Sequence, residues 1–177
     1  MTLPVNVIAV LLIAALTSCS SMRIDSDYDT SASFSGFKTY SWMARQQQAS
    51  RDPRLDSTLL ESRVSAAVDR ELSAKGYAKV PLEEADFLVA YHVTREGRMQ
   101  LHTMGGPGWG WGGTTTHVEK YEEGTLILDV IASDGRMLLW RGTATARIDE
   151  SAGAEKREKR INEAVRRMLQ RFPPRLT

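Results

Sequence analysis

Cys19 has the clearest chemistry of any residue in this 177-residue chain, because of the residues that precede it. The run Leu16-Thr17-Ser18 leads into it and closes an unbroken apolar stretch that begins at Val7. Such a run is typical of a bacterial lipobox, in which a dedicated peptidase cuts before a cysteine that carries diacylglycerol. We therefore predict that Cys19 is lipidated and that residues 1–18 are a lipoprotein signal peptide.

The length of the apolar stretch separates this interpretation from a membrane-spanning one. A transmembrane helix needs roughly 18 or more apolar residues, whereas residues 7–16 suit the hydrophobic region of a signal peptide. Residues 1–6 hold no Lys or Arg, so an ordinary secretory signal with an incidental cysteine is the alternative. No second cysteine follows Cys19, and lipidation would account for a single thiol in an exported chain.

A glycine-rich segment at residues 104–113 contains a GxGxxG pattern. A phosphate site needs a helix after such a loop, but residues 114–119 are strand-like, so glycine density explains the match. We expect a mobile loop between two strands. One hypothesis is that it presents Trp109 and Trp111 to a bilayer, a glycan or a protein, because indole rings favour such interfaces. The alternative is a hairpin tip whose tryptophans pack back on the sheet.

The residues that could bind metal or perform catalysis are scattered. His92, His102 and His117 lie far apart, and Glu119 adds only one ligand beside His117. Zinc needs three or four converging ligands, so no metal site and no cofactor are predicted. No spacing brings two carboxylates into one pocket, and no G-x-S-x-G nucleophile motif occurs. We predict no catalytic residue.

Asp129 stands alone in an apolar strand. If it points inward it needs a partner, and Arg141 on the neighbouring strand is the candidate. The alternative is that Asp129 faces outward, opposite Leu128 and Val130. Asp134, by contrast, is explained by turn chemistry, because it precedes Gly135.

Hydrophobic periodicity predicts two amphipathic helices and several strands. The first helix begins at Ser57 or Thr58 and ends before Gly76, and the second ends at Pro173-Pro174. The expected strands lie within residues 24–28, 34–42, 87–93, 125–131 and 137–147, the last two joined by a turn.

This order predicts an α+β fold, a two-layer sandwich in which two helices cover one face of a mostly antiparallel sheet. Residues 24–177 are the expected single domain, and residues 19–23 are the lipidated anchor and a short tether. The 23 basic and 22 acidic residues nearly cancel, so we expect no nucleic-acid partner. The basic C-terminal helix is interpreted as having a solvated outer face, with a contact to anionic headgroups as the alternative.

Several motifs together resemble a widespread family of bacterial envelope lipoproteins whose domain has no known function. The motifs follow one another over nearly the whole chain after Cys19: FSxFxTYxW at 34–42, ADFLVxY at 85–91, GTLxLD at 124–129, WRGTA at 140–144, INxAV at 161–165 and FPP at 172–174. The resemblance implies a lipid-anchored globular domain and brings no catalytic residues. Because Ser20 and not Asp follows the cysteine, it also implies sorting to the outer membrane, facing the periplasm.

We therefore expect a lipid-anchored envelope lipoprotein with acyl chains such as palmitate, acting as a non-enzymatic binding or scaffold module in the periplasm. Its expected partners are the membrane, through the N-terminal lipid, and an envelope protein or glycan. One alternative is a periplasmic hydrolase with a site assembled from distant residues, which a deep polar pocket with shifted pKa values would favour. Another is a carrier of a small hydrophobic ligand, which requires a cavity between helices and sheet.

Overall fold

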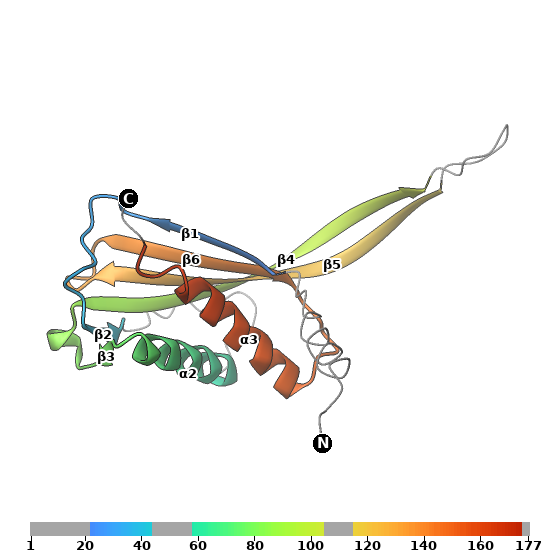
Figure 1. Cartoon of the computed structure of the whole chain (residues 1–177). Helices are drawn as coiled ribbons and strands as arrows, with labels where there is room; N and C mark the ends of the chain where they lie inside the picture. The colour runs from blue at the N-terminus through green and yellow to red at the C-terminus, as the bar shows by residue number, and fades with distance from the viewer. Residues whose placement is uncertain (1–21, 44–57, 105–114, 175–177) are drawn as a thin grey trace, which may run out of the picture.

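A single sheet organises the protein (Figure 1). The computed structural model describes residues 22–43, 58–104 and 115–174. The strands are β1 (Arg23–Tyr28), β2 (Thr39–Trp42), β3 (Ala78–Lys79), β4 (Phe87–Met104), β5 (Thr115–Ala132) and β6 (Leu138–Arg147). Their order across the sheet is β1-β6-β5-β4-β2-β3, and the pairs that β2 makes with β3 and β4 are parallel while the other pairs are antiparallel.

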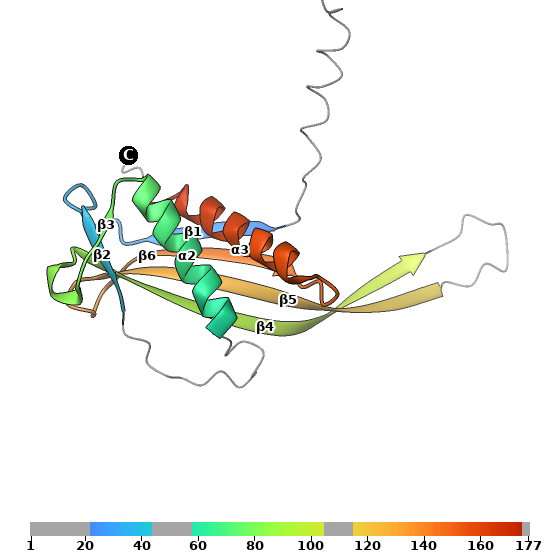
Figure 2. The same cartoon turned by 90° about the horizontal axis from the view of Figure 1, so that it is seen from below.

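Two long helices, α2 (Thr58–Ala74) and α3 (Ala154–Leu169), lie side by side on one face of this sheet (Figure 2). A short 3-10 helix, η1 (Leu82–Glu84), precedes β4. The predicted α+β fold, with two helices on one face of a mostly antiparallel sheet, is therefore confirmed. No helix in the described part of the chain combines the length and the hydrophobicity that crossing a membrane requires.

The local signals read from the sequence explain where the first helix lies and where it ends. Its buried residues recur at helical spacing and face the sheet: Val64, Ala67, Val68 and Leu72. After it, Gly76 adopts a φ of +90°, which glycine tolerates best, and its amide donates to the carbonyl oxygen of Ser73 at 2.9 Å.

Helix α3 ends at Leu169, earlier than the predicted end at Pro173-Pro174. Phe172, three residues after it, is fully buried at the centre of an aromatic cluster. Its ring centroid lies 5.3 Å from that of Trp140, 5.6 Å from Phe87 and 5.9 Å from Phe34. These rings come from β6, β4 and the segment before β2, so the cluster joins both ends of the described chain to the sheet. Such aromatic pairs stabilise a core beyond the burial of their area.

Asp69 of α2 ties the helix to the parallel edge of the sheet. Its carboxylate accepts hydrogen bonds from the Tyr40 hydroxyl and the Trp42 indole, and Lys79 Nζ donates to it as well, each at 2.9 Å. Burial, followed by the bond to Asp69, raises the pKa of Tyr40 well above its ordinary value. The hydroxyl therefore remains a donor at physiological pH.

The two central strands extend far beyond the rest of the sheet (Figures 1 and 2). Residues 97–104 of β4 and 115–122 of β5 have strand partners only in each other, since β6 ends opposite Glu123 and β2 opposite Val89. At the base of this segment, the amide of Ile148 still donates to the carbonyl oxygen of Glu122 at 2.8 Å. We call this two-stranded extension the ribbon, and the helix-covered remainder the body. At about 3.4 Å per residue, the ribbon extends roughly 25 Å from the body.

The ribbon is the main difference from the predicted elements. The expected strands at 87–93 and 125–131 are the body portions of β4 and β5, which each run on for 18 residues in total. Charged residues interrupt the apolar pattern beyond Val93, so periodicity alone ended these strands too early. The short strand β3 and its parallel pairing with β2 were also not predicted.

Candidate ligand-binding pocket

A pocket of about 640 Å³ opens between the two helices and the sheet. This volume lies within the range of about 300–1,000 Å³ that is typical of small-molecule sites. Its floor is formed by inward-facing residues of three strands, its walls by one face of each helix. Met22, directly before β1, and four residues between β6 and α3 complete its lining: Ile148, Asp149, Glu150 and Ala152.

Apolar side chains supply most of the lining. The floor residues Val93, Leu126, Ala144 and Ala146 face the helices, because they alternate with outward-facing residues along their strands. Small side chains at two of these four positions leave room that larger residues would fill. The remaining apolar lining residues are Met22, Leu59, Leu60, Val64, Ile148, Ala152, Ile161 and Ala164.

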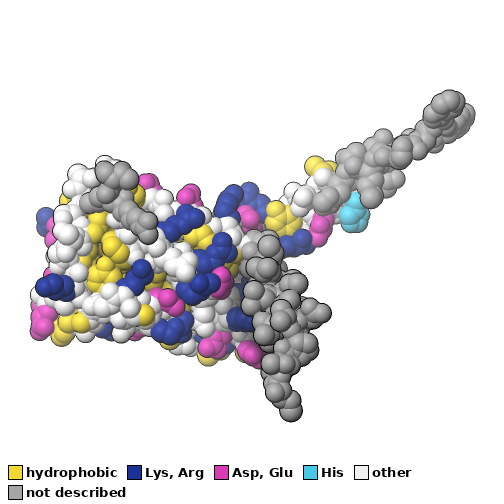
Figure 3. Space-filling view, in the orientation of Figure 1, with side chains coloured by type: hydrophobic (Ala, Val, Ile, Leu, Met, Phe, Trp, Pro, Cys, Tyr) yellow, Lys and Arg dark blue, Asp and Glu magenta, His cyan; other side chains and the backbone are white. Residues whose placement is uncertain are grey.

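Arginines stand at the end of the pocket nearest the ribbon. Arg157 and Arg160 of α3 donate to the backbone carbonyl oxygens of Glu150 and Arg147, at 3.2 and 2.7 Å. Because those oxygens carry no formal charge, the bonds hold the guanidinium groups in place without neutralising them. Arg63 of α2 lines the opposite wall. Lys and Arg side chains also gather on the half of the body next to the ribbon (Figure 3).

The acidic residues at this end form ion pairs with Arg and Lys side chains. Arg95 forms ion pairs with both Glu122 and Glu150. Asp149 accepts a bond from Lys156 Nζ at 2.7 Å, and this bond, with those from Ser151, lowers the pKa of Asp149 to about 2. The rim therefore keeps an excess of positive charge above an apolar floor, an arrangement that suits a ligand with an apolar body and an anionic head.

Asp129 lies on the opposite, uncovered face of the sheet. It faces away from Leu128 and Val130, which agrees with the predicted outward orientation, yet it is only 3% exposed. Both its oxygens accept hydrogen bonds of 2.7 Å from Arg141, the partner that was predicted for an inward-pointing Asp129. This bond and the charge of Asp129 raise the pKa of Arg141. His92 Nε2 lies 3.7 Å from the same carboxylate.

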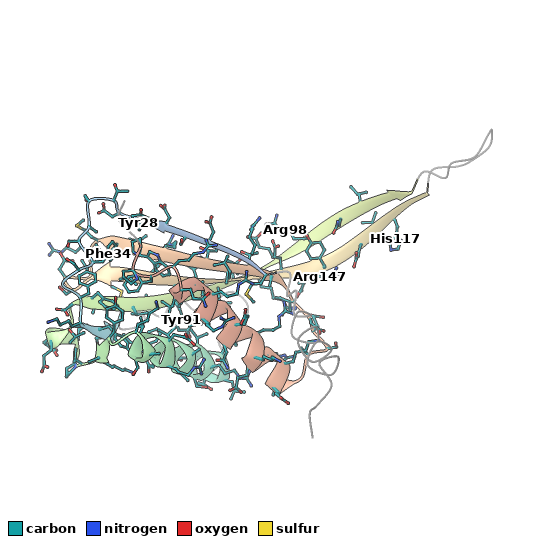
Figure 4. The ribbon with its side chains drawn as sticks, viewed as in Figure 1. Tyr28, Phe34, Tyr91, Arg98, His117 and Arg147 are labelled. Atoms are coloured by element: carbon teal, nitrogen blue, oxygen red, sulfur yellow. The ribbon has the colours of Figure 1, made fainter. Side chains whose placement is uncertain are left out.

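The remaining predicted site residues are apart from the pocket or outside the described part of the chain. Cys19, Trp109 and Trp111 belong to the latter group. His117 lies on the ribbon, far from the body, with His102 opposite it in register (Figure 4). Among the described residues, no three His, Cys, Asp or Glu side chains converge on a point that could hold a metal ion.

Two of the sequence motifs prove to hold the fold together. Asp86 accepts bonds from the backbone amides of Lys38 and Thr39, each at 2.8 Å, and these bonds lower the pKa of its carboxyl. Gly142 leaves room for the indole of Trp140, since a Cβ there would lie 2.4 Å from Cη2 of that ring. These motif residues position the sheet and loops and do not line the pocket.

Residues 24–174 match a protein family described as Domain of unknown function (DUF4136). The chain belongs to this family. No curated protein matches the chain.

Solved structures that are similar to this chain include a PDZ domain protein from Parabacteroides distasonis, with a TM-score of 0.55 and 12% identity over 87% of this chain. The chain spans 36% of that protein's length. A PelC dodecamer from Paraburkholderia phytofirmans gives a TM-score of 0.48 and 13% identity, covering 87% of this chain and 99% of the other. At such identities the first likeness concerns the fold alone.

The pocket was missed by sequence reasoning, although one of the alternatives named the place where it would lie. Its lining comes from distant segments, and no local pattern joins Ala146 to Leu60 or Arg157. The arginines of the C-terminal helix were interpreted as a solvated outer face, but Arg157 and Arg160 stand at the rim of the pocket. The spacing of these two residues, three apart on one helix face, was the available signal.

Proposed function

We propose that this protein is a lipid-anchored, non-enzymatic binding module of the bacterial envelope that takes a small amphipathic anion into its pocket. The observation that carries the proposal is the pocket itself, with an apolar floor and an arginine-bearing rim between helices and sheet. A fatty acid is the simplest ligand of this chemistry. An apolar pocket of this kind supports binding, whereas a deep polar one would have supported hydrolysis.

Anchoring and location extend this proposal. The lipobox supports acylation at Cys19, and the resemblance to envelope lipoproteins supports the periplasmic face of the outer membrane. Met22 at the pocket is the third residue after Cys19, and three residue steps reach at most about 11 Å. An acylated Cys19 would thus hold the pocket close to the membrane, where amphipathic anions are abundant.

Titration of the purified protein with a fluorescent fatty acid tests the binding. Ala146→Phe places a large side chain on the pocket floor and should abolish saturable binding. Ala78→Phe, the same change at an exposed position of β3, should leave binding unchanged. If Ala146→Phe binds as the unaltered protein does, while both variants melt at similar temperatures, the pocket is not the site.

The charge of the rim is tested separately. Arg63→Gln should weaken binding of the fatty acid by roughly three- to tenfold, the range expected for one partly exposed charged contact. It should leave binding of the matching fatty alcohol unchanged, because the alcohol has no anionic head. Equal effects on acid and alcohol would show that Arg63 acts through packing and not through charge.

A further inference from the structure

The ribbon carries an apolar stripe on one of its two faces. Leu101 lies directly opposite Val118 in the antiparallel register, and Met99 lies opposite Lys120 on the same face. The side chains of Met99 and Leu101 are 72% and 68% exposed, and that of Val118 is 47% exposed. Three neighbouring apolar side chains exposed on one surface make this stripe a candidate contact site.

The other face of the ribbon differs in character. Arg98 forms ion pairs with Glu96 and Glu123, at 2.9 and 3.3 Å. The guanidinium of Arg147 lies 4.8 Å from the centroid of the Tyr121 ring and also forms an ion pair with Glu119. Figure 4 shows Arg98 and Arg147 at the base of the ribbon. The charged side chains of this face are paired within the chain, so the ribbon is amphipathic.

The outer part of the ribbon carries no Asp, Glu, Lys or Arg. From Met99 to Val118 the sequence contains no Asp, Glu, Lys or Arg, although charged residues make up 25% of the chain. Arg98, Glu119 and Lys120 stand just on the body side of this boundary, and Glu119 forms an ion pair with Arg147. Basic residues that border an uncharged, apolar surface are typical of segments that meet a membrane interface, because their long side chains reach the headgroups.

The ribbon also leaves the body at the end where the described chain begins. Arg23, the first residue of β1, pairs with Thr145, which in turn pairs with Thr125 of β5, two residues from the point where β6 ends. The N-terminus of the body and the base of the ribbon are therefore neighbours (Figure 1). A chain held at a membrane by its N-terminal segment would bring the ribbon to the same surface.

We propose that the stripe of Met99, Leu101 and Val118 rests in the headgroup region of a lipid bilayer, as a second contact beside the N-terminal anchor. Only the anchor rests on the function proposed above. The contact is shallow, because the outer edges of a two-stranded ribbon carry backbone groups that hydrocarbon cannot satisfy. A second contact beside the anchor would fix how the body stands on the membrane, which one anchor with a short tether leaves free.

The test places an environment-sensitive dye on the full chain in vesicles of phosphatidylethanolamine and phosphatidylglycerol. Leu101→Cys carries the dye on the stripe, and Met137→Cys carries it at an exposed position on the opposite end of the sheet. We expect a blue shift and quenching by spin-labelled lipids at position 101, and neither at position 137. The unaltered chain, treated with dye in the same way, measures any labelling of Cys19.

Two further variants separate the stripe from the anchor and from self-association. In the Leu101→Cys background, Met99→Thr with Val118→Thr should abolish the quenching, while Leu82→Thr with Leu138→Thr should preserve it. Threonine keeps the strand preference of the ribbon. Quenching that survives the loss of the stripe, or no quenching at position 101 in vesicle-bound protein, would overturn the proposal. A blue shift that grows with protein concentration in the absence of vesicles would also overturn it, in favour of a second copy.

Discussion

Removing Arg141 from the pair with Asp129 should destabilise the protein by about 2 kcal/mol. The Asp129 side chain is 5% exposed and accepts both of its strong bonds from Arg141, whose own side chain is 43% exposed. Breaking a fully buried pair by removing one partner costs about 3–5 kcal/mol. The exposure of Arg141 lowers this figure, because water can enter the space that it leaves and solvate part of the carboxylate.

Urea denaturation of Arg141→Met measures this loss, with Arg136→Met as the control, since Arg136 is exposed in the turn before β6. The control should change the free energy of unfolding by less than about 0.5 kcal/mol. The double variant Asp129→Asn/Arg141→Met should recover about 1 kcal/mol relative to the sum of the single variants, because no buried charge is left. A cost for Arg141→Met equal to that of the control would show that water solvates Asp129 in the folded protein, and the reasoning would be wrong.

Three other changes have definite expected outcomes. Gly142→Ala should destabilise the protein by about 1–3 kcal/mol, because its Cβ would meet Trp140, whereas Gly36→Ala, which meets nothing within 4 Å, should not on steric grounds; thermal melting distinguishes them. Because folding lowers the pKa of Asp86, the ionised carboxylate stabilises the fold at pH values above its ordinary pKa of 3.8, and this contribution is lost as the pH falls through the lowered pKa. The stability of Asp86→Asn should therefore fall less steeply than that of the unaltered protein in denaturation curves between about pH 5 and 2. Cys19→Ala should move the protein from the membrane fraction to the soluble fraction after cell lysis, and retention in the membrane would contradict the lipobox interpretation.

Features with a local physical cause were predictable from the sequence. Gly76 and Gly135 adopt positive φ values that few other residues tolerate, so the helix end and the turn between β5 and β6 lie where expected. The face that α2 buries follows from the 3.6-residue period of its apolar positions. The partnership of Asp129 with Arg141 was predicted from chemistry alone, because a carboxylate in a strand needs a donor nearby when it is buried.

Features that depend on distances between elements were not predictable in the same way. The pocket exists because Ala144 and Ala146 are small where the helices cross the sheet, and small residues give no local signal. The ribbon escaped notice because Arg95, Glu96 and Arg98 resemble loop residues until their pairing is known. The outward face of Asp129 is buried because Arg141 covers it, which alternation along the strand does not indicate.

The order of the strands constrains when the protein can fold. β1 is the first described strand, yet it pairs only with β6. Tyr28, for example, cannot form its pair until Trp140 has been synthesised. A chain that emerges from its N-terminus cannot close this edge of the sheet until more than a hundred further residues have followed. Long-range pairing of this kind slows folding. If the chain is exported as the lipobox suggests, the same delay would keep it unfolded, and so able to pass through a translocation channel, until nearly all of it has crossed the membrane.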